Sequence, residues 1–327
     1  MARFLLRRFA NSVALVLLAT VMIFFLASMT LNPRANYEGR NPPVPAASVN
    51  QKLDQLNMNP STPIPVRFRR WLADLAHGDF GQTIDGRSVN EEMGRRMGVS
   101  LRLLLLGSLV GAFFGVMFGV LGALRQYRPS DRLVTVLSFV LLSTPVFFLA
   151  VLLKVGALQV NDTVGTTLLY YTGEKTPGLD VGTMGALLDR LQHLILPTLS
   201  IALGSIAFYS RYQRNAMLDV LGSDFLRTAQ AKGLTRRRAL FKHGVRTALI
   251  PMSTFFAFSF GTLLVGATFT EKIFGWHGMG EWFVDSINKN DINAVSAVTL
   301  FSAVCILVSG FLADLAYAAL DPRVRFT

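Results

Sequence analysis

The sequence is poor in cysteine and in charged residues. A single cysteine, Cys305, excludes an intrachain disulfide framework and any cysteine-based metal cluster. Only 16% of the 327 residues are charged, against about 25% in soluble globular proteins. Acidic residues are the scarcer charged residues: there are 20 Asp and Glu against 32 Lys and Arg, so the formal net charge is +12. With 51% hydrophobic residues, this balance disfavours a nucleic-acid-binding domain and favours a membrane protein with basic cytosolic loops.

Several catalytic and nucleotide-binding motifs are also missing. No lysine lies between a glycine and a Ser or Thr, so the chain has no phosphate-binding loop for ATP. No serine sits in a G-x-S-x-G elbow. The four histidines have no second histidine four residues away and no nearby carboxylate pair, which disfavours a zinc site; they are His77, His193, His243 and His277. We therefore expect no catalytic, cofactor or metal site in this chain.

Ionisable residues are rare within the apolar segments. Arg102 and Lys154 are expected at outer ends and Asp314 at an inner end, where long side chains reach the interface. A proton-driven carrier would need acids or histidines near the membrane midplane. An intramembrane enzyme would need a paired nucleophile and base. Both rival classes lack their required residues here.

Six uncharged runs approach the roughly 20 residues that cross a hydrocarbon core. They are Phe9–Met29, Leu103–Leu124, Leu133–Leu153, Leu194–Ser210, Thr247–Thr270 and Ala294–Ala313. The first follows three arginines and could be a signal peptide, but its length favours a retained helix. The fourth is short and contains Pro197. The expected fold class is an all-α integral membrane protein with six transmembrane helices.

Loop charges predict the orientation. The 211–246 loop holds nine Lys and Arg against two acids, and the N-terminus, the 125–132 loop and the tail are also basic. Loops 159–193 and 271–293 each hold two bases against four acids. This alternation predicts that both termini are cytoplasmic. The long 32–99 loop carries nine bases, but long loops are translocated largely regardless of charge.

The long loop is expected to lie outside the cytoplasm. Its proline-rich part, Asn32 to Pro65, predicts extended and partly mobile chain. Val66–Ala76 has near-helical apolar spacing, and Gly78-Asp79-Phe80-Gly81 predicts a turn. Val89–Met97 predicts a short helix that leads into the second span.

Four glycines in the second span recur at every fourth residue: Gly107, Gly111, Gly115 and Gly119. Such a stripe lets another helix backbone approach closely, since packing contacts must drive helix association in lipid. The partner helix lies either in the same chain or in another subunit.

The 211–246 loop is too long for a simple turn and is not disordered in composition. Ser223 is expected to cap a helix over Asp224–Lys232, and Gly233 to end it in a left-handed conformation. Thr235 is expected to cap a second helix that runs to Ile250. Small residues on the first helix suit docking into a cleft of another protein, and the alternative is a solvated surface. The candidate docking residues are Asp224, Phe225, Leu226, Arg227, Thr228, Ala229, Ala231, Lys232, Gly233 and Leu234. Arg236, Arg237 and Arg238 are expected to anchor to anionic lipid headgroups.

These residues carry a family resemblance. The run from Arg227 to Leu234, with Ala248-Leu249-Ile250-Pro251 after it, resembles the cytoplasmic loop of ABC-transporter permeases, specifically the oligopeptide/dipeptide permease B subunits. Gly78-Asp79-Phe80-Gly81, Glu271-Lys272-Ile273-Phe274, Gly278-Met279-Gly280 and Leu320-Asp321-Pro322-Arg323 agree with it. Arg227 and Thr228 replace the Glu and first Ala of the superfamily pattern, as in the peptide-permease branch.

The resemblance implies a type I ABC importer permease in the bacterial cytoplasmic membrane. This chain would form half of the translocation pathway, with a second homologous permease as the other half. Two separate ATPase subunits or domains would bind ATP and magnesium and grip the 224–234 helix. An extracytoplasmic binding protein would deliver oligopeptides or dipeptides, with nickel chelates and oligosaccharides as alternative substrates.

The same resemblance divides the chain by its relation to the membrane. Residues 1–31 would be the N-terminal span, 32–98 the extracytoplasmic loop region, 99–317 the permease core and 318–327 the cytoplasmic tail.

Overall fold

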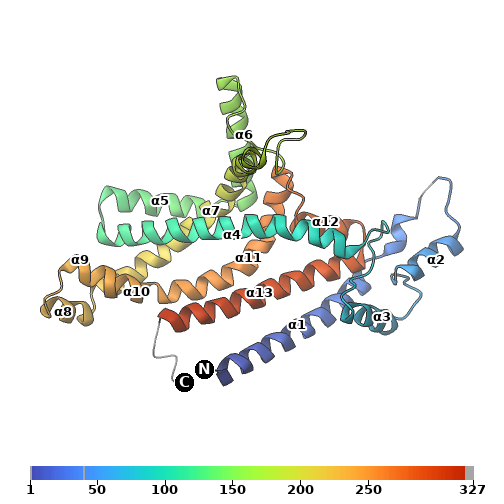
Figure 1. Ribbon diagram of the computed structural model, residues 1–327, viewed down its shortest axis with the longest axis horizontal. Helices are drawn as coiled ribbons and strands as arrows, with labels where there is room; N and C mark the ends of the chain where they lie inside the picture. Colours follow the sequence, from blue (N-terminus) through green and yellow to red (C-terminus); the bar gives the residue numbers. More distant parts are fainter. Residues whose placement is uncertain (1, 40, 321–327) are drawn as a thin grey trace. The chain divides into compact units, whose positions relative to one another are not determined.

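The computed structural model describes residues 2–39 and 41–320, and within that part of the chain the regular structure is helical. One isolated bridge pairs Gln82 with Ser88. Residues 321–327 lie outside the described residues, and with them most of the expected tail and of the Leu320-Asp321-Pro322-Arg323 motif. The side chains of Arg3, Arg7, Arg8 and Asp314 also lie outside them. The elements run in the order α1 (Ala2–Thr30), η1 (Pro33–Asn36), α2 (Ala46–Gln55), α3 (Ile64–Ala76), α4 (Val89–Leu124), α5 (Pro129–Ser143), α6 (Val146–Val164), α7 (Thr183–Leu221), α8 (Asp224–Ala231), α9 (Arg236–Ala239), the π-helical η2 (Leu240–Gly244), α10 (Val245–Ala248), α11 (Ile250–Phe274), α12 (Met279–Asn288) and α13 (Ile292–Leu320) (Figure 1).

Within the described residues, five segments are long and apolar enough to span a membrane. They are Phe9–Thr30, Val89–Leu124, Val146–Val164, Thr183–Leu221 and Ile292–Leu312. The predicted run Leu133–Leu153 is divided between α5 and α6, so it is not one continuous helix. The predicted run Thr247–Thr270 does not form one helix, because Thr247 belongs to the short α10 and the long helix α11 begins at Ile250. The count of six spans stays a prediction.

The chain forms two compact units by its internal contacts. The first comprises Leu101–Trp276 together with α13 from Val308 onward. The second comprises Ala2–Ser100 and His277–Leu307. This grouping by contacts differs from a division by membrane topology, which remains our expectation.

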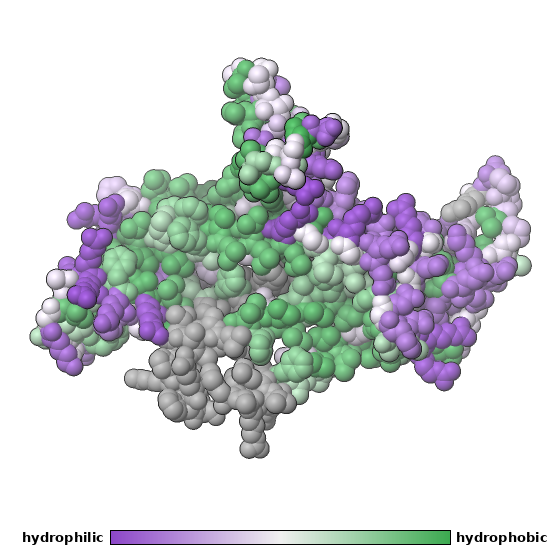
Figure 2. Space-filling model, in the orientation of Figure 1, coloured by the Kyte–Doolittle hydropathy of each residue, from purple (hydrophilic) through white to green (hydrophobic). Residues whose placement is uncertain are grey.

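In the first unit, α7 is the central packing element. It contacts α5, α6 and α11, and α6 also packs against α11. Figure 1 shows α5 and α6 pointing in different directions on either side of Thr144. Hydrophobic side chains cover the visible faces of α5 and of the part of α4 that belongs to this unit, whereas hydrophilic side chains gather over α8 and α9 (Figure 2). That distribution suits helices in lipid that lead to a loop in water.

In the second unit, a small aromatic core joins α1 to the segment that follows it. Phe24 and Trp71 are buried with ring centroids 5.1 Å apart, and the rest of the core comprises Ala27, Leu53, Leu56, Met58, Ile84, Ile292 and Val295. The prediction of an extended, mobile Asn32 to Pro65 segment is therefore wrong in part. This segment contains α2, whose Leu53 is fully buried. The prolines of this segment lie before or after α2 and none lies within it, so they permit the helix.

Buried polar groups fasten the turn after α3 onto the start of α13. The Asp291 carboxylate accepts hydrogen bonds from the backbone N–H groups of Ile84 and Ala294, at 2.8 and 3.0 Å. The Asn293 amide donates to the carbonyls of Leu56 and Gln82, at 3.0 and 2.9 Å. These contacts hold segments together that are some 200 residues apart in sequence.

Candidate functional site

The glycine stripe of α4 faces α7 of the same chain. A methyl group built on Gly115 would lie 2.5 Å from Tyr209 Cβ and 3.1 Å from the Ile206 carbonyl. One built on Gly119 would lie 2.6 Å from Gln213 Cβ. Gly107 and Gly111 meet Ile201 and Ser205 in the same way. The sequence left open whether the partner helix lies in the same chain or in another subunit. The structure shows that it is α7 of the same chain, and the backbones of α4 and α7 approach each other along the whole stripe.

A buried ion pair ties the start of α5 to α7. Arg214 donates to both Asp131 oxygens, with Nε–Oδ1 at 2.7 Å and Nη2–Oδ2 at 2.8 Å. Asp131 is only 3% exposed and also accepts the Tyr127 N–H. The guanidinium of Arg214 holds the pKa of the Asp131 carboxyl below its ordinary value. Sequence reasoning missed this pair, although Asp131 is the single acid in an otherwise basic loop.

The chain after α7 folds into a compact helical segment, the α8–α10 loop (Asp224–Ala248). The α8 helix ends as predicted: Lys232 is the C-cap and Gly233 has φ = +91°, a left-handed conformation that glycine adopts without strain. Thr235 also caps α9 as predicted, since its side chain accepts the Arg238 N–H. The expected second helix is interrupted, because Leu240–Gly244 is π-helical.

The α8–α10 loop has its own apolar core against α4 and α7. Leu226 and Leu240 are 4% and 6% exposed and pack with Val120, Ala123, Met217, Val220, Ala239 and Ala248. Ala229 and Leu234 pack against the same cluster. The loop is therefore folded onto the helices that precede it.

One sequence-based expectation about α8 is wrong. Ser223 stands at the N-cap position, but its hydroxyl donates to the Val220 carbonyl instead of accepting from α8. Leu226 is buried and Ala229 is half-buried against the core of the α8–α10 loop, and their expected contacts with another protein stay a prediction. The exposed residues of this stretch are Asp224, Phe225, Arg227, Thr228, Gln230, Ala231, Lys232 and Gly233. Among them Phe225, 43% exposed, is the large apolar side chain.

The polar residues expected near span ends have specific partners. Arg102 forms an ion pair with Glu174 at 3.0 Å. Lys154 lies within α6 rather than at its outer end, and its ammonium donates to the Ile273 carbonyl, 2.5 Å away, at the C-terminus of α11. A cation at a helix C-terminus is electrostatically favourable, so Lys154 fastens α6 to α11.

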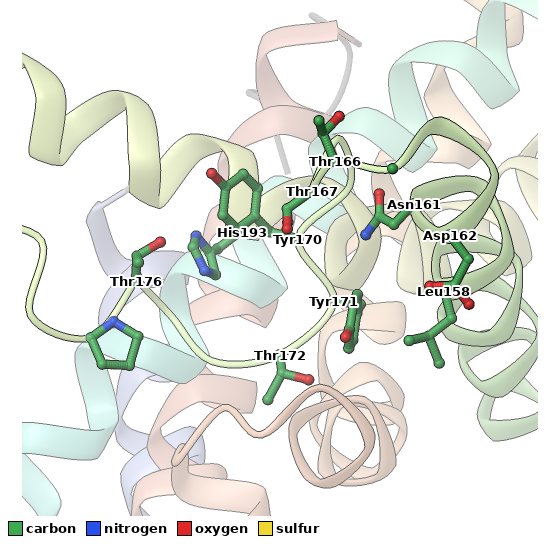
Figure 3. A pocket seen from close by; sticks show the side chains of 12 residues that line it. Leu158, Asn161, Asp162, Thr166, Thr167, Tyr170, Tyr171, Thr172, Thr176 and His193 are labelled. Carbon is green, nitrogen blue, oxygen red and sulfur yellow. The ribbon is translucent and has the colours of Figure 1, made fainter.

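A polar pocket of about 730 Å³ lies in the α6–α7 connection. His193 forms part of its wall and stacks on Tyr170, with ring centroids 4.4 Å apart (Figure 3). The His193 Nδ1–H donates to the Asp189 carbonyl, and the Asp189 carboxylate accepts from the N–H and hydroxyl of Thr176. The lining can hydrogen-bond a polar molecule.

Within residues 2–39 and 41–320 no group of three or more His, Cys, Asp and Glu could hold a metal ion. Two histidines do have carboxylate neighbours that the sequence reading did not assign. His193 lies 3.6 Å from an Asp189 oxygen and His277 lies 2.8 Å from a Glu281 oxygen. Each is a single pair, fewer than the three protein ligands of a zinc site.

The fold and the α8–α10 loop define a class: a multi-pass membrane protein with a folded helical loop packed on its long helices. The chain belongs to the family of binding-protein-dependent transport system inner membrane components, whose pattern matches residues 115–326. This membership confirms the family resemblance inferred from the sequence. It also confirms the expected permease fold class.

Individual relatives match most or nearly all of the chain. The oligopeptide transport system permease protein OppB of Mycobacterium tuberculosis is 54% identical over 325 residues, 99% of each chain. The oligopeptide transport system permease protein AppB of Bacillus subtilis is 34% identical over the full length of both chains. The di/tripeptide transport system permease protein DppB of Pseudomonas aeruginosa is 34% identical over 80% of this chain and 81% of its own.

Proposed function

We propose that this chain is a permease subunit of an ATP-driven importer of oligopeptides or dipeptides. The observation that carries the proposal is 54% identity over 99% of the chain to a permease named for oligopeptide transport. Two more distant relatives are also named for peptide substrates. The chain forms half of the translocation pathway, and a second homologous permease forms the other half.

The energy comes from partner subunits. The sequence has no phosphate-binding loop, so ATP and magnesium are bound by two ATPase subunits or domains. The exposed face of α8 is the surface that these subunits grip, because it presents Phe225 among polar side chains on a folded support. An extracytoplasmic binding protein delivers the substrate, and ATP binding shifts the helices between two arrangements.

The topology belongs to the same proposal. Both termini and the α8–α10 loop lie in the cytoplasm of a bacterial cell, and residues 32–98 lie outside it. Residues 99–317 are the permease core, in which the α4–α7 seam and the α8–α10 loop are packed together.

Uptake by the reconstituted importer tests the substrate class. The complex of both permeases, the ATPase subunits and the binding protein is placed in lipid vesicles with ATP inside. We expect ATP-dependent accumulation of labelled dipeptides or longer oligopeptides, and none of a nickel chelate or an oligosaccharide. Accumulation of either of the last two without peptide would contradict the proposal.

A further inference from the structure

The third apolar run is broken at its centre. α5 ends at Ser143, Thr144 is extended (φ −97°, ψ 123°), and Pro145 caps the start of α6 at Val146. Ser143 is the central residue of the uncharged run Leu133–Leu153. The break therefore falls within an uncharged run of the sequence, directly before Val146–Val164, which is long and apolar enough to span a membrane.

The break leaves peptide groups without helical partners. Pro145 has no N–H to donate. The Thr144 N–H bonds the Leu141 carbonyl, and the Phe148 and Leu149 N–H groups bond the Pro145 carbonyl. The carbonyls of Leu142 and Ser143 belong to the last turn of α5, where a helix has no further N–H partners. Thr144 and Pro145 are both extended (ψ 123° and 140°), so the first N–H groups of α6 are directed away from these carbonyls, and both residues are exposed.

Exposed, unpaired carbonyls are incompatible with contact to lipid chains. Hydrocarbon offers no hydrogen-bond donor, so interrupted backbone at membrane depth occurs only where protein or water reaches it. In transporters, discontinuous helices line the substrate site. The polar Ser143 hydroxyl at the same position also favours water over lipid.

An aromatic pair flanks the break. The rings of Phe147 in α6 and Phe269 in α11 have centroids 5.9 Å apart, and both residues are about half exposed, at 46% and 53%. Every peptide carries main-chain N–H donors whatever its sequence, and these match free carbonyls. Exposed rings accept apolar side chains of many shapes.

We propose that the Leu142–Pro145 break lines the translocation pathway, where its free carbonyls accept hydrogen bonds from the main-chain amides of a passing peptide. Phe147 and Phe269 contact the side chains of that peptide. The assignment of peptide as the molecule in transit rests on the proposed function. Because recognition is through the main chain, the break favours passage of peptides of varied sequence.

Cysteine labelling of the reconstituted complex tests this position. In a Cys305→Ser background, Ser143→Cys is compared with Leu137→Cys, an exposed position on the intact part of α5. A charged thiosulfonate is supplied on both sides of the membrane. Position 143 should react roughly tenfold or more faster than position 137, because a charged reagent is excluded from hydrocarbon. Transported peptide should slow the reaction at 143 only.

Equal labelling rates at positions 143 and 137 would overturn the inference. It would also be overturned if the cysteine at position 143 did not react with the reagent and instead formed a cross-link to the second permease. The labelling rates test the lining of the pathway whatever molecule is imported. Peptide uptake by the Cys305→Ser complex is measured separately. Uptake together with an unreactive position 143 refutes the pathway assignment alone, whereas rapid labelling without peptide uptake refutes the peptide substrate alone.

A second variant tests the break without a thiol. Pro145→Ala restores an N–H that can bond the Leu141 carbonyl and continue the helix. We expect assembly to be retained and uptake to fall several-fold. Pro129→Ala is the matched control, because Pro129 is at the first turn of α5, where no helical bond is lost. Normal uptake by both variants would count against the pathway assignment.

Discussion

The smallest side chains in α4 determine how closely it packs on α7. At Gly115 an added methyl group would meet both a side chain and a backbone carbonyl of α7, and a backbone carbonyl cannot turn aside. Gly94 lies on the same helix with no atom within 4 Å of its would-be Cβ. The two positions therefore separate the effect of close packing from the effect of helix propensity.

We predict that Gly115→Ala destabilises the protein and that Gly94→Ala does not. Overpacking of a tight contact costs about 1–3 kcal/mol. Alanine in place of a helical glycine otherwise gains about 0.5–1 kcal/mol. Thermal unfolding of each variant in detergent measures the difference. Equal unfolding temperatures for the two variants would show that the α4–α7 seam tolerates a side chain.

At Asp291, burial produces a dependence of stability on pH. Desolvation raises the pKa of this carboxyl to about 6, although two backbone N–H groups and Lys289 favour its ionised form and Asp85 opposes it. The folded protein then binds the proton more tightly than the unfolded chain. Its contribution to stability is greatest below about pH 4, falls as pH rises to about 6, and is level above that.

The fall should amount to about 3 kcal/mol, since each pKa unit corresponds to about 1.4 kcal/mol. Asp291→Asn should remove this slope while lowering stability overall, because an amide has a single acceptor oxygen for two N–H donors. Asp85→Asn, at an exposed carboxylate, should leave the slope in place. Unfolding temperatures between pH 4 and pH 7 provide the measurement. An unchanged slope in Asp291→Asn would assign the pH dependence to another group.

At the scale of single elements, α8 concentrates the contacts expected with an ATPase subunit. Truncation of an aromatic anchor at an interface costs about 2 kcal/mol or more, which is roughly thirtyfold in affinity. We predict that Phe225→Ala weakens ATPase binding by this amount and uncouples hydrolysis from uptake, without loss of membrane insertion.

Phe241→Ala is the matched control for Phe225→Ala. Phe241 is also exposed, but it lines an apolar groove with α4 rather than the outer face of α8. Binding of purified ATPase subunits to each variant complex gives the two affinities. If Phe225→Ala binds as tightly as the control, the α8 face is solvated rather than a docking surface.

Elements with continuous apolar sequence could be predicted from the sequence, and those that depend on tertiary contact could not. The spans in α1, α4 and α13 follow from long uncharged runs. α7 extends from Thr183 to Leu221, well beyond the predicted Leu194–Ser210, because a helix can continue past the uncharged run that marks a span; Arg214, in the added part, pairs with Asp131. α2 was missed because its prolines were taken to exclude a helix, although they flank it.

The α8–α10 loop shows the same limit within one site. The left-handed Gly233 and the Thr235 cap were predictable, since each depends on local backbone chemistry. Which face of α8 points outward was not, because the burial of Leu226 and Ala229 depends on α4 and α7. The π-helical turn at Leu240–Gly244 has no simple sequence signal.

For the whole molecule, the distribution of charge predicts the orientation in the membrane. Positively charged loops are retained in the cytoplasm, and the nine lysines and arginines of residues 211–246 are the largest such group among the shorter loops. The 32–98 region carries comparable positive charge, yet its length and its ordered aromatic core suit a segment that folds after translocation.

Impermeant thiol labelling of intact cells, in a Cys305→Ser background, tests this orientation. Single cysteines at Ser48 and Asn288 should react from outside, and those at Ser130 and Arg237 should react only after the membrane is opened. All four positions are exposed, whereas Ser286, in the same turn as Asn288, is buried and unsuitable. Each pair samples two loops, so that one misplaced span would change the result at only some positions. Reaction at position 237 in intact cells would place the α8–α10 loop outside and remove it from reach of any cytoplasmic ATPase.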